Sequence, residues 1–245
     1  MILKISSWLG RFTALWFALQ IVACTNPSHD APRDFAWKVL DYKAAKYSHT
    51  VLPNGQIHLE IIHLPLVGIT PEMLAWWYRV LPISEVEVDG KRYPFYHLFH
   101  LSEHGRIWLK QAAADGQPGM GVGALVARQE WFGQFDSEGA GRITEFSTRG
   151  MTVHPEVAGI WLGEIRHNFE LAPGGSRYRV DSLIGVDWPL VGPAVNWLLR
   201  TSTFNEAMLR EWERHQIEEV ANLGYFLPQL YAQRAQAPRY VLKFK

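Results

Sequence analysis

A long helix that follows a series of short strands is the feature that most limits what this chain can fold into. Between residues 93 and 186, apolar runs alternate with turns rich in glycine and polar residues. Runs such as 122–135 and 177–186 therefore predict antiparallel strands. The expected turns lie at 115–119, 137–141 and 173–176.

The long helix is expected over residues 205–223. Thr203 and Glu206 stand in the register of a capping box, and Gly224 marks the helix end. A shorter helix is expected around 195–199. Strands followed by a long terminal helix predict an α+β fold in which the helix lies across a curved sheet.

Two more elements are expected before residue 93. The apolar run 56–66 follows a Pro-Asn-Gly turn and predicts a strand. Thr70 is a suitable helix N-cap, Pro71 suits the first helical position, and Pro82 stops the helix that they begin.

The first 24 residues have the pattern of an export signal. Lys4 and Arg11 precede an apolar stretch, 12–23, which is shorter than the ~20 residues of a membrane span but long enough for a signal-peptide core. The stretch ends at Cys24, the only cysteine, in a pattern that resembles a bacterial lipoprotein signal. We therefore expect a signal peptide at 1–23 and a lipid on Cys24, which would be the only membrane attachment, on the periplasmic face of the cell envelope. The alternatives are a cleaved signal that happens to contain a cysteine, or an amphipathic first helix.

Composition narrows the class of protein further. Residues 25–36 are rich in proline and polar groups, which predicts an extended tether over 24–50 and one domain over 51–245. The chain has 24 basic and 24 acidic residues, so it lacks the excess of positive charge that nucleic-acid binding requires. Its eleven tryptophans suit a hydrophobic cavity for a small molecule. The oligomeric state is not predicted.

One face of the long helix combines apolar residues with a histidine and a glutamate. On a helical wheel, residues within an arc of about 80° share a core-facing stripe. They are Met208, Trp212, His215, Glu219 and Leu223. A buried carboxylate needs a partner or a metal, and residues four apart on a helix can reach one ion. The alternatives are a His215–Glu219 hydrogen bond without metal, or a frayed helix with Glu219 in solvent.

Further metal ligands are available upstream. The tract 93–104 holds three histidines on an expected strand and its following turn. On a strand, His97 and His100 face opposite sides, so only one of them can line a cavity. Glu130 places an acid in an apolar strand, although by itself such a residue is more often solvent-facing.

Four segments together resemble the 2,4-diacetylphloroglucinol hydrolase family. They are GITPEMLAWWY (68–78), YHLFHLSEH (96–104), EWFG (130–133) and RHQIEEVANL (214–223). The similarity spans most of residues 60–231, and the order and spacing of the segments carry it. The resemblance implies a helix-grip, Bet v1-like fold, in which a curved antiparallel sheet surrounds the long C-terminal helix and a deep cavity. It also makes 51–245 a hydrolase-like domain.

The resemblance implies one zinc ion held by two histidines and two glutamates. Matched position by position, the expected ligands are His100, Glu130, His215 and Glu219. His104 is the reserve for the place of His100, because this chain has Leu101 and Glu103 where the family usually has Pro and Asp.

The implied activity is hydrolysis of the carbon–carbon bond between an acyl group and a phenolic ring, as in an acylphloroglucinol. We expect Tyr93 or Tyr96 to hydrogen-bond a phenolic oxygen and His167 to donate a proton, a structural role for His167 being the alternative. Two rivals remain: a non-catalytic lipid-anchored protein that binds an apolar or aromatic molecule, and a metal-free cyclase or hydratase. The natural substrate is not predicted.

Overall fold

The computed structural model describes residues 29–243. The expected signal peptide and Cys24 lie outside these residues. Within them, no helix is both long enough and apolar enough to cross a membrane.

Ten strands of the described chain form one curved antiparallel sheet. Its main path runs β1-β2-β12-β11-β9-β8-β7-β6, with β3 paired to β12 and β10 paired to β9. The strands are β1 (Lys46–Val51), β2 (Ile57–Ile62), β3 (Leu66–Val67), β6 (His104–Gln111), β7 (Leu125–Phe132), β8 (Phe135–Ser147), β9 (Gly150–Val157), β10 (Ile160–Trp161), β11 (Gly163–Ala172) and β12 (Gly175–Ile184).

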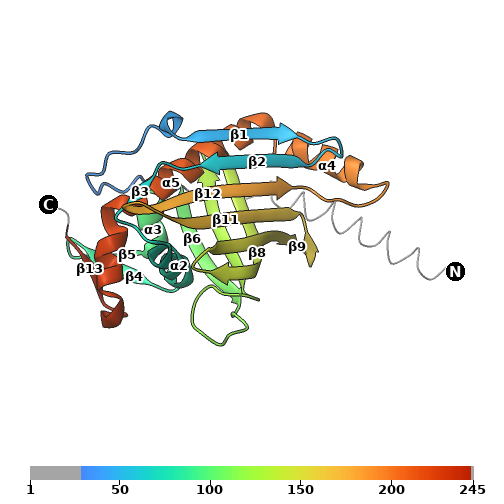
Figure 1. Cartoon of the computed structure of the whole chain (residues 1–245). Coiled ribbons are helices and arrows are strands. Elements are labelled where there is room, and N and C mark those ends of the chain that lie inside the picture. The colour runs from blue at the N-terminus through green and yellow to red at the C-terminus, as the bar shows by residue number, and fades with distance from the viewer. Residues whose placement is uncertain (1–28, 244–245) are drawn as a thin grey trace.

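A smaller sheet, in the order β13-β4-β5, lies beside the C-terminal end of α5 (Figure 1). Its strands are β4 (Glu85–Val88), β5 (Lys91–Pro94) and β13 (Tyr240–Leu242). The helical elements are η1 (Tyr42–Ala44), α2 (Pro71–Val80), α3 (Phe95–Phe99), α4 (Gly192–Ser202), α5 (Glu206–Ala232) and η2 (Arg234–Gln236).

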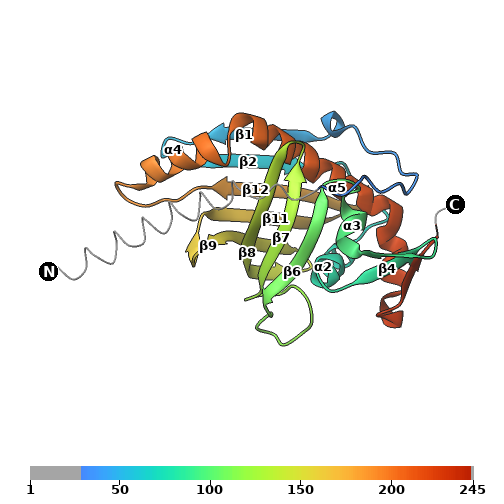
Figure 2. The same ribbon diagram turned by 180° about the vertical axis from the view of Figure 1, so that it is seen from behind.

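Helix α5 lies along the curved sheet, as both ribbon views show (Figures 1 and 2). All five residues of the predicted stripe are buried, from Met208 to Leu223. Aromatic side chains fill the core where α2, α3 and α5 meet; the Trp77 ring lies 5.2 Å from Phe95 and 4.9 Å from Phe226. This is a helix-grip, Bet v1-like α+β fold, as expected from the order of strands and helix.

Several predicted boundaries are confirmed. The Thr70 hydroxyl accepts a hydrogen bond from the Met73 backbone N–H at the start of α2, with Pro71 in the first turn. A turn lies at the start of the predicted stretch 173–176: Pro173 and Gly174 join β11 to β12, and Gly174 has a positive φ of 78°.

The ends of α5 differ from those expected. The N-cap is Asn205, whose side chain accepts from the Met208 N–H, whereas Thr203 is the C-cap of α4. The helix also continues through Gly224 and Pro228 to Ala232. Burial of apolar side chains beyond Gly224 outweighs the modest preference of glycine for a helix end.

Three other expectations are wrong. Residues 29–50 are not a free tether, because Phe35 is buried in the core and β1 pairs with β2. Residues 137–141 lie inside β8 rather than in a turn. The tract 93–104 is not one strand: it contains the end of β5, the short helix α3, a turn, and only then the start of β6. Strand alternation therefore does not govern His97 and His100.

Candidate metal centre

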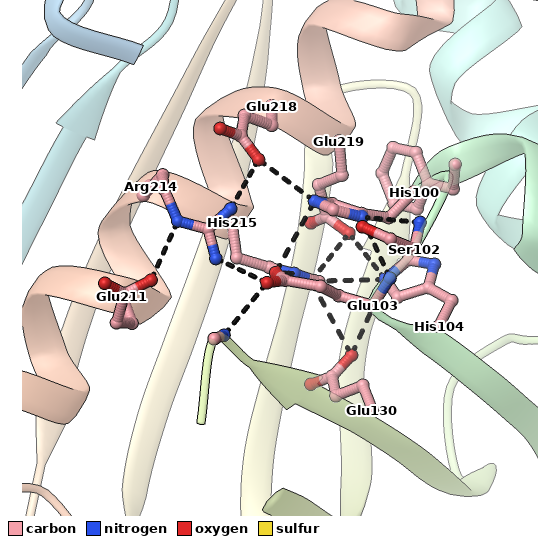
Figure 3. Close-up of polar contacts among 12 residues, drawn as sticks. His100, Ser102, Glu103, His104, Glu130, Glu211, Arg214, His215, Glu218 and Glu219 are labelled. Carbon is pink, nitrogen blue, oxygen red and sulfur yellow. Dashed lines mark hydrogen bonds and ion pairs between the residues drawn. The ribbon is translucent and has the colours of Figure 1, made fainter. Parts of the chain in front are cut away.

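Three elements bring two histidines and two glutamates together (Figure 3). Helix α5 presents one histidine–glutamate pair from successive turns. On the sheet, His104 at the start of β6 is the direct cross-strand partner of Glu130 on β7, so both face the helix side. We call this set the four-donor centre: His104, Glu130, His215 and Glu219. All four side chains are buried, and both imidazoles are 0% exposed.

The donor atoms of the four-donor centre are spaced as ligands of one ion. His104 Nε2 lies 3.2 Å from His215 Nε2, 3.3 Å from Glu219 Oε2 and 3.7 Å from Glu130 Oε2. His215 Nε2 lies 3.6 Å from Glu219 Oε2 and 3.9 Å from Glu130 Oε2. Nitrogen and oxygen ligands about 2.0–2.1 Å from a tetrahedral zinc are separated by roughly 3.3 Å. These spacings fit that donor set.

The outer nitrogens of both imidazoles are already used. His104 Nδ1 lies 2.8 Å from the Tyr96 carbonyl oxygen, and His215 Nδ1 lies 2.8 Å from Glu103 Oε2. Both acceptors require an N–H, so in each neutral ring the hydrogen is on Nδ1 and Nε2 carries a lone pair. The two Nε2 lone pairs therefore face each other, an arrangement that a shared cation would stabilise.

Electrostatics within the four-donor centre also suit a cation. Burial, followed by the charges of neighbouring histidines, holds the pKa of His104 well below its ordinary value. Burial and then His100 do the same for His215. Burial, followed by the charge of Glu130, raises the pKa of Glu219 well above its ordinary value. A divalent ion would favour the ionised carboxylate and reverse that last shift.

A second layer of polar groups fixes these side chains. Glu103 accepts from His215 through Oε2 and, through Oε1, from the Gly133 N–H at 2.9 Å and Arg214 at 2.5 Å. Arg214 also donates to Glu211 and Glu218. A carboxylate that orients a ligating histidine is typical of metal sites.

Glu130 is oriented in the same way. The Tyr96 hydroxyl donates to its Oε2 at 2.5 Å, and Arg128 donates to its Oε1. The Tyr96 ring also stacks on the His104 imidazole, with centroids 3.7 Å apart. Tyr96 thus acts on the four-donor centre. We expected its hydroxyl to hydrogen-bond a phenolic oxygen, but the hydroxyl donates its hydrogen to Glu130 instead.

His100 lies beside the four-donor centre rather than in it. Its ring stacks on His215 at 4.5 Å, its Nδ1 accepts from the Glu103 backbone N–H, and its Nε2 lies 3.2 Å from Glu218. His100, Glu103 and His215 form a second group that could hold a metal ion. Every donor atom of that second group is paired with a complementary protein group, whereas the two Nε2 atoms of the four-donor centre face each other and the Glu219 carboxyl group. The geometry therefore favours His104, the reserve candidate, over His100.

The four-donor centre opens onto a largely apolar cavity of about 270 Å³ between the sheet and α5. Glu130 and Glu219 line this cavity. Its apolar wall includes Phe99, Ile107, Phe132, Met151 and Trp212. A cavity of this kind is suited to a small molecule with an apolar or aromatic body.

His167 and Tyr78 line the same cavity. His167 Nδ1 lies 2.6 Å from the Tyr178 hydroxyl, which lies 2.5 Å from the Tyr78 hydroxyl. Burial, followed by the charge of Arg128, lowers the pKa of His167 to about 3, so its imidazole is neutral. Tyr93 is elsewhere: its ring packs edge-on against Phe35 and does not line the cavity.

Sequence reasoning missed three residues that surround the four-donor centre: Glu103, Arg128 and Arg214. Arg128 could have been found, because it is two residues from Glu130 and so shares its strand face. Glu103 and Arg214 carried no comparable signal, since their pairing joins a turn to a helix more than a hundred residues away.

No protein-family model and no curated protein matches the sequence. Solved structures do. A Rhodobacter sphaeroides protein is 12% identical, with a TM-score of 0.40 over 74% of this chain and 97% of that chain. Ms6760 from Mycobacterium smegmatis is 8% identical, with a TM-score of 0.43 over 76% and 97%. Ara h 8.0201 is 12% identical, with a TM-score of 0.38 over 69% and 97%. At these values the likeness bears on the general fold alone.

Proposed function

We propose that this protein is a zinc-dependent hydrolase that cleaves the carbon–carbon bond between an acyl group and a phenolic ring. The observation that carries the proposal is the four-donor centre at the edge of an apolar cavity. The reaction class comes from the resemblance, and three of the four ligands that it implied, Glu130, His215 and Glu219, lie together.

The proposed metal is zinc because two imidazole nitrogens and two carboxylate oxygens are donors that zinc accepts in a four-coordinate site. A zinc ion held by the four-donor centre would supply Lewis-acid polarisation of the substrate carbonyl. Glu103 and Tyr96 would keep the donor atoms in position through their hydrogen bonds to His215 and Glu130.

The protein's own side chains account for the other steps. The apolar wall binds the phenolic ring and limits the entry of bulk water. Hydrolysis adds the hydroxyl of water to the acyl carbon and a proton to the ring carbon, which releases a carboxylic acid and the deacylated phenol. We assign delivery of that proton to His167 Nε2, while Nδ1 takes the Tyr178 hydroxyl proton; the proton that the attacking water loses then returns to Nε2 as Nδ1 gives the Tyr178 proton back.

The N-terminal signal is part of the proposal. Lipidation of Cys24 would hold the enzyme at the periplasmic face of the cell envelope. In cells, Cys24→Ser is expected to move the protein from the membrane fraction to the soluble fraction. Retention of that variant in the membrane fraction would contradict the anchor.

Metal analysis of the purified full-length protein tests the zinc assignment. We expect about one zinc per chain, a loss of at least tenfold in zinc affinity for Glu219→Gln, and retention of zinc by the matched control Glu218→Gln. Glu218 is adjacent in sequence but pairs with Arg214 and His100. A protein that neither contains nor takes up zinc would contradict the proposal.

Turnover distinguishes the hydrolase from the rival binding protein. Zinc-loaded protein is expected to release a carboxylic acid from acylated phenols, detected by NMR. Zinc binding without turnover of any acylphenol in a panel would favour a metal-stabilised carrier. Turnover by fully zinc-free protein would favour a metal-free enzyme instead.

A further inference from the structure

Arg128 presents hydrogen-bond donors to the cavity that no described protein group uses. It lies on β7, two residues from Glu130, and lines the cavity with it. Its Nε donates to Glu130 Oε1. Its two terminal nitrogens make no hydrogen bond to any described residue, and they are accessible to solvent. The side chain is 35% exposed although β7 is an inner strand of the sheet.

The strand beside Arg128 leaves room for a ligand. Gly139 on β8 is its direct cross-strand partner. A Cβ atom at Gly139 would lie 3.5 Å from Arg128 Nη1, so the guanidinium extends over this glycine. A larger residue here would occupy the space next to the terminal nitrogens.

Nearby carboxylates do not compete for the free end of Arg128. Asp136 lies 2.6 Å from His29, and Glu156 accepts two hydrogen bonds from Arg142. Glu138 also lines the cavity, but it is exposed and makes no hydrogen bond or ion pair with Arg128. The guanidinium fork is therefore available to a molecule inside the cavity.

We propose that Arg128 is an oxyanion subsite, and that the molecule bound in this cavity is an aromatic compound bearing a carboxylate or an ionised phenol. The two terminal N–H groups can bind one planar oxyanion with two parallel hydrogen bonds. The apolar wall contacts the aromatic body, so charge and ring are recognised at separate places.

Arg128 also links this subsite to the four-donor centre, because its Nε holds Glu130 while its terminal nitrogens face the ligand. A ring anchored by its oxyanion at Arg128 would lie beside the donor atoms that hold the metal. As a statement about the substrate, this inference rests on the proposed function; as a statement about ligand recognition, it can be tested without metal.

The test compares charged and neutral ligands of similar shape on metal-free protein. Naphthoate is compared with naphthamide to test a carboxylate, and dinitrophenolate with dinitroanisole to test an ionised phenol. Binding of each compound is measured by calorimetry. The wild type is expected to bind at least one anion about tenfold more tightly than its neutral partner, as a hydrogen bond to a charged group implies. Arg128→Met is expected to remove this preference, and Arg128→Lys to keep part of it.

Arg214→Met is the matched control. It removes one positive charge that, like the charge of Arg128, acts on His215, but the guanidinium of Arg214 is already bonded to Glu103, Glu211 and Glu218. Arg214→Met should therefore retain the anion preference. Loss of the preference in Arg214→Met to the same degree would assign it to general charge and overturn the subsite.

Other outcomes are equally decisive. If the wild type binds the anion and its neutral partner equally tightly in both pairs, the proposal is overturned, even if the Arg128 variants do not fold. A preference that appears only after zinc loading assigns the anion to the metal and also overturns it. If metal-free protein prefers the anions but the zinc-loaded protein cleaves no acylphenol, the subsite is supported and the proposed hydrolase function fails.

Discussion

The Nε2 atoms of His104 and His215 lie 3.2 Å apart, and neither carries a hydrogen, because each ring donates its Nδ1–H to a fixed acceptor. Hydrogen bonding between the two rings does not account for the pair, since it would need a donor on one side. The Glu219 oxygen lies 3.3 and 3.6 Å from them, longer than charge-assisted hydrogen bonds. These three buried donor groups could hold a cation, and an ion shared between the two Nε2 atoms and Glu219 would stabilise this arrangement.

Substitution of His104 and of His100 tests which of the two histidines binds the metal directly. His104→Ala is expected to abolish stoichiometric zinc binding, because it removes one of only four donors. His100→Ala should retain zinc, because His100 acts through Glu218 and the turn after α3. Metal content after gel filtration measures both. Loss of zinc in His100→Ala but not in His104→Ala would transfer the site to the second group.

Glu103→Gln tests the support of His215. The amide keeps the shape of the side chain but weakens the bond that fixes the ring's tautomer, so zinc affinity is expected to fall by roughly 10- to 100-fold. Glu211→Gln is the matched control, because Glu211 bonds the same Arg214 and does not contact His215. Competition with a zinc-binding dye measures both affinities. Equal affinities in the two variants would exclude this role of Glu103.

If the proposed zinc is bound, its removal should destabilise the fold. A ligand present at about 100 times its dissociation constant stabilises the native state by about 2.7 kcal/mol. For a chain of this size, the melting temperature should then fall by roughly 5–10 °C after chelation. His104→Ala is expected to be insensitive to chelator, and differential scanning calorimetry compares the two. An unchanged melting temperature of the wild type would argue against a bound ion.

His49 should make stability depend on pH at a place remote from the four-donor centre. It joins β1 to α5, with Nδ1 2.9 Å from Glu213 and Nε2 2.8 Å from Glu206. Burial opposes the charged ring, but hydrogen bonds to these two glutamates raise the pKa of His49 above its ordinary value. Its contribution is therefore complete below the unfolded pKa of about 6.5 and is lost as pH rises through the folded pKa.

Urea unfolding of the wild type and His49→Gln measures this effect. The difference in unfolding free energy is expected to be on the order of 1 kcal/mol near pH 5.5, and to shrink by pH 9. Glu213→Gln should remove most of the same dependence, because Glu213 is the buried partner. A difference that stays constant across this range would show that the ion pairs do not contribute.

Local patterns predicted much of this protein because they depend on neighbours in the chain. The cap at Thr70 and the buried stripe on α5 follow from the geometry of single helices. The inward direction of Glu219 was therefore predictable. Glu130 was predicted from the family resemblance, because by itself an acid in such a strand is more often solvent-facing.

The sequence by itself determined which residues of α5 face inward, because a period of 3.6 residues is a property of the helix alone. Only the tertiary structure decided that His104 and not His100 joins them. That choice depends on α3, a five-residue helix that exists because Phe95, Leu98 and Phe99 are buried against other elements, and on the curvature that brings β6 and β7 to α5. Distances between elements far apart in the chain are set by packing, which no local pattern encodes.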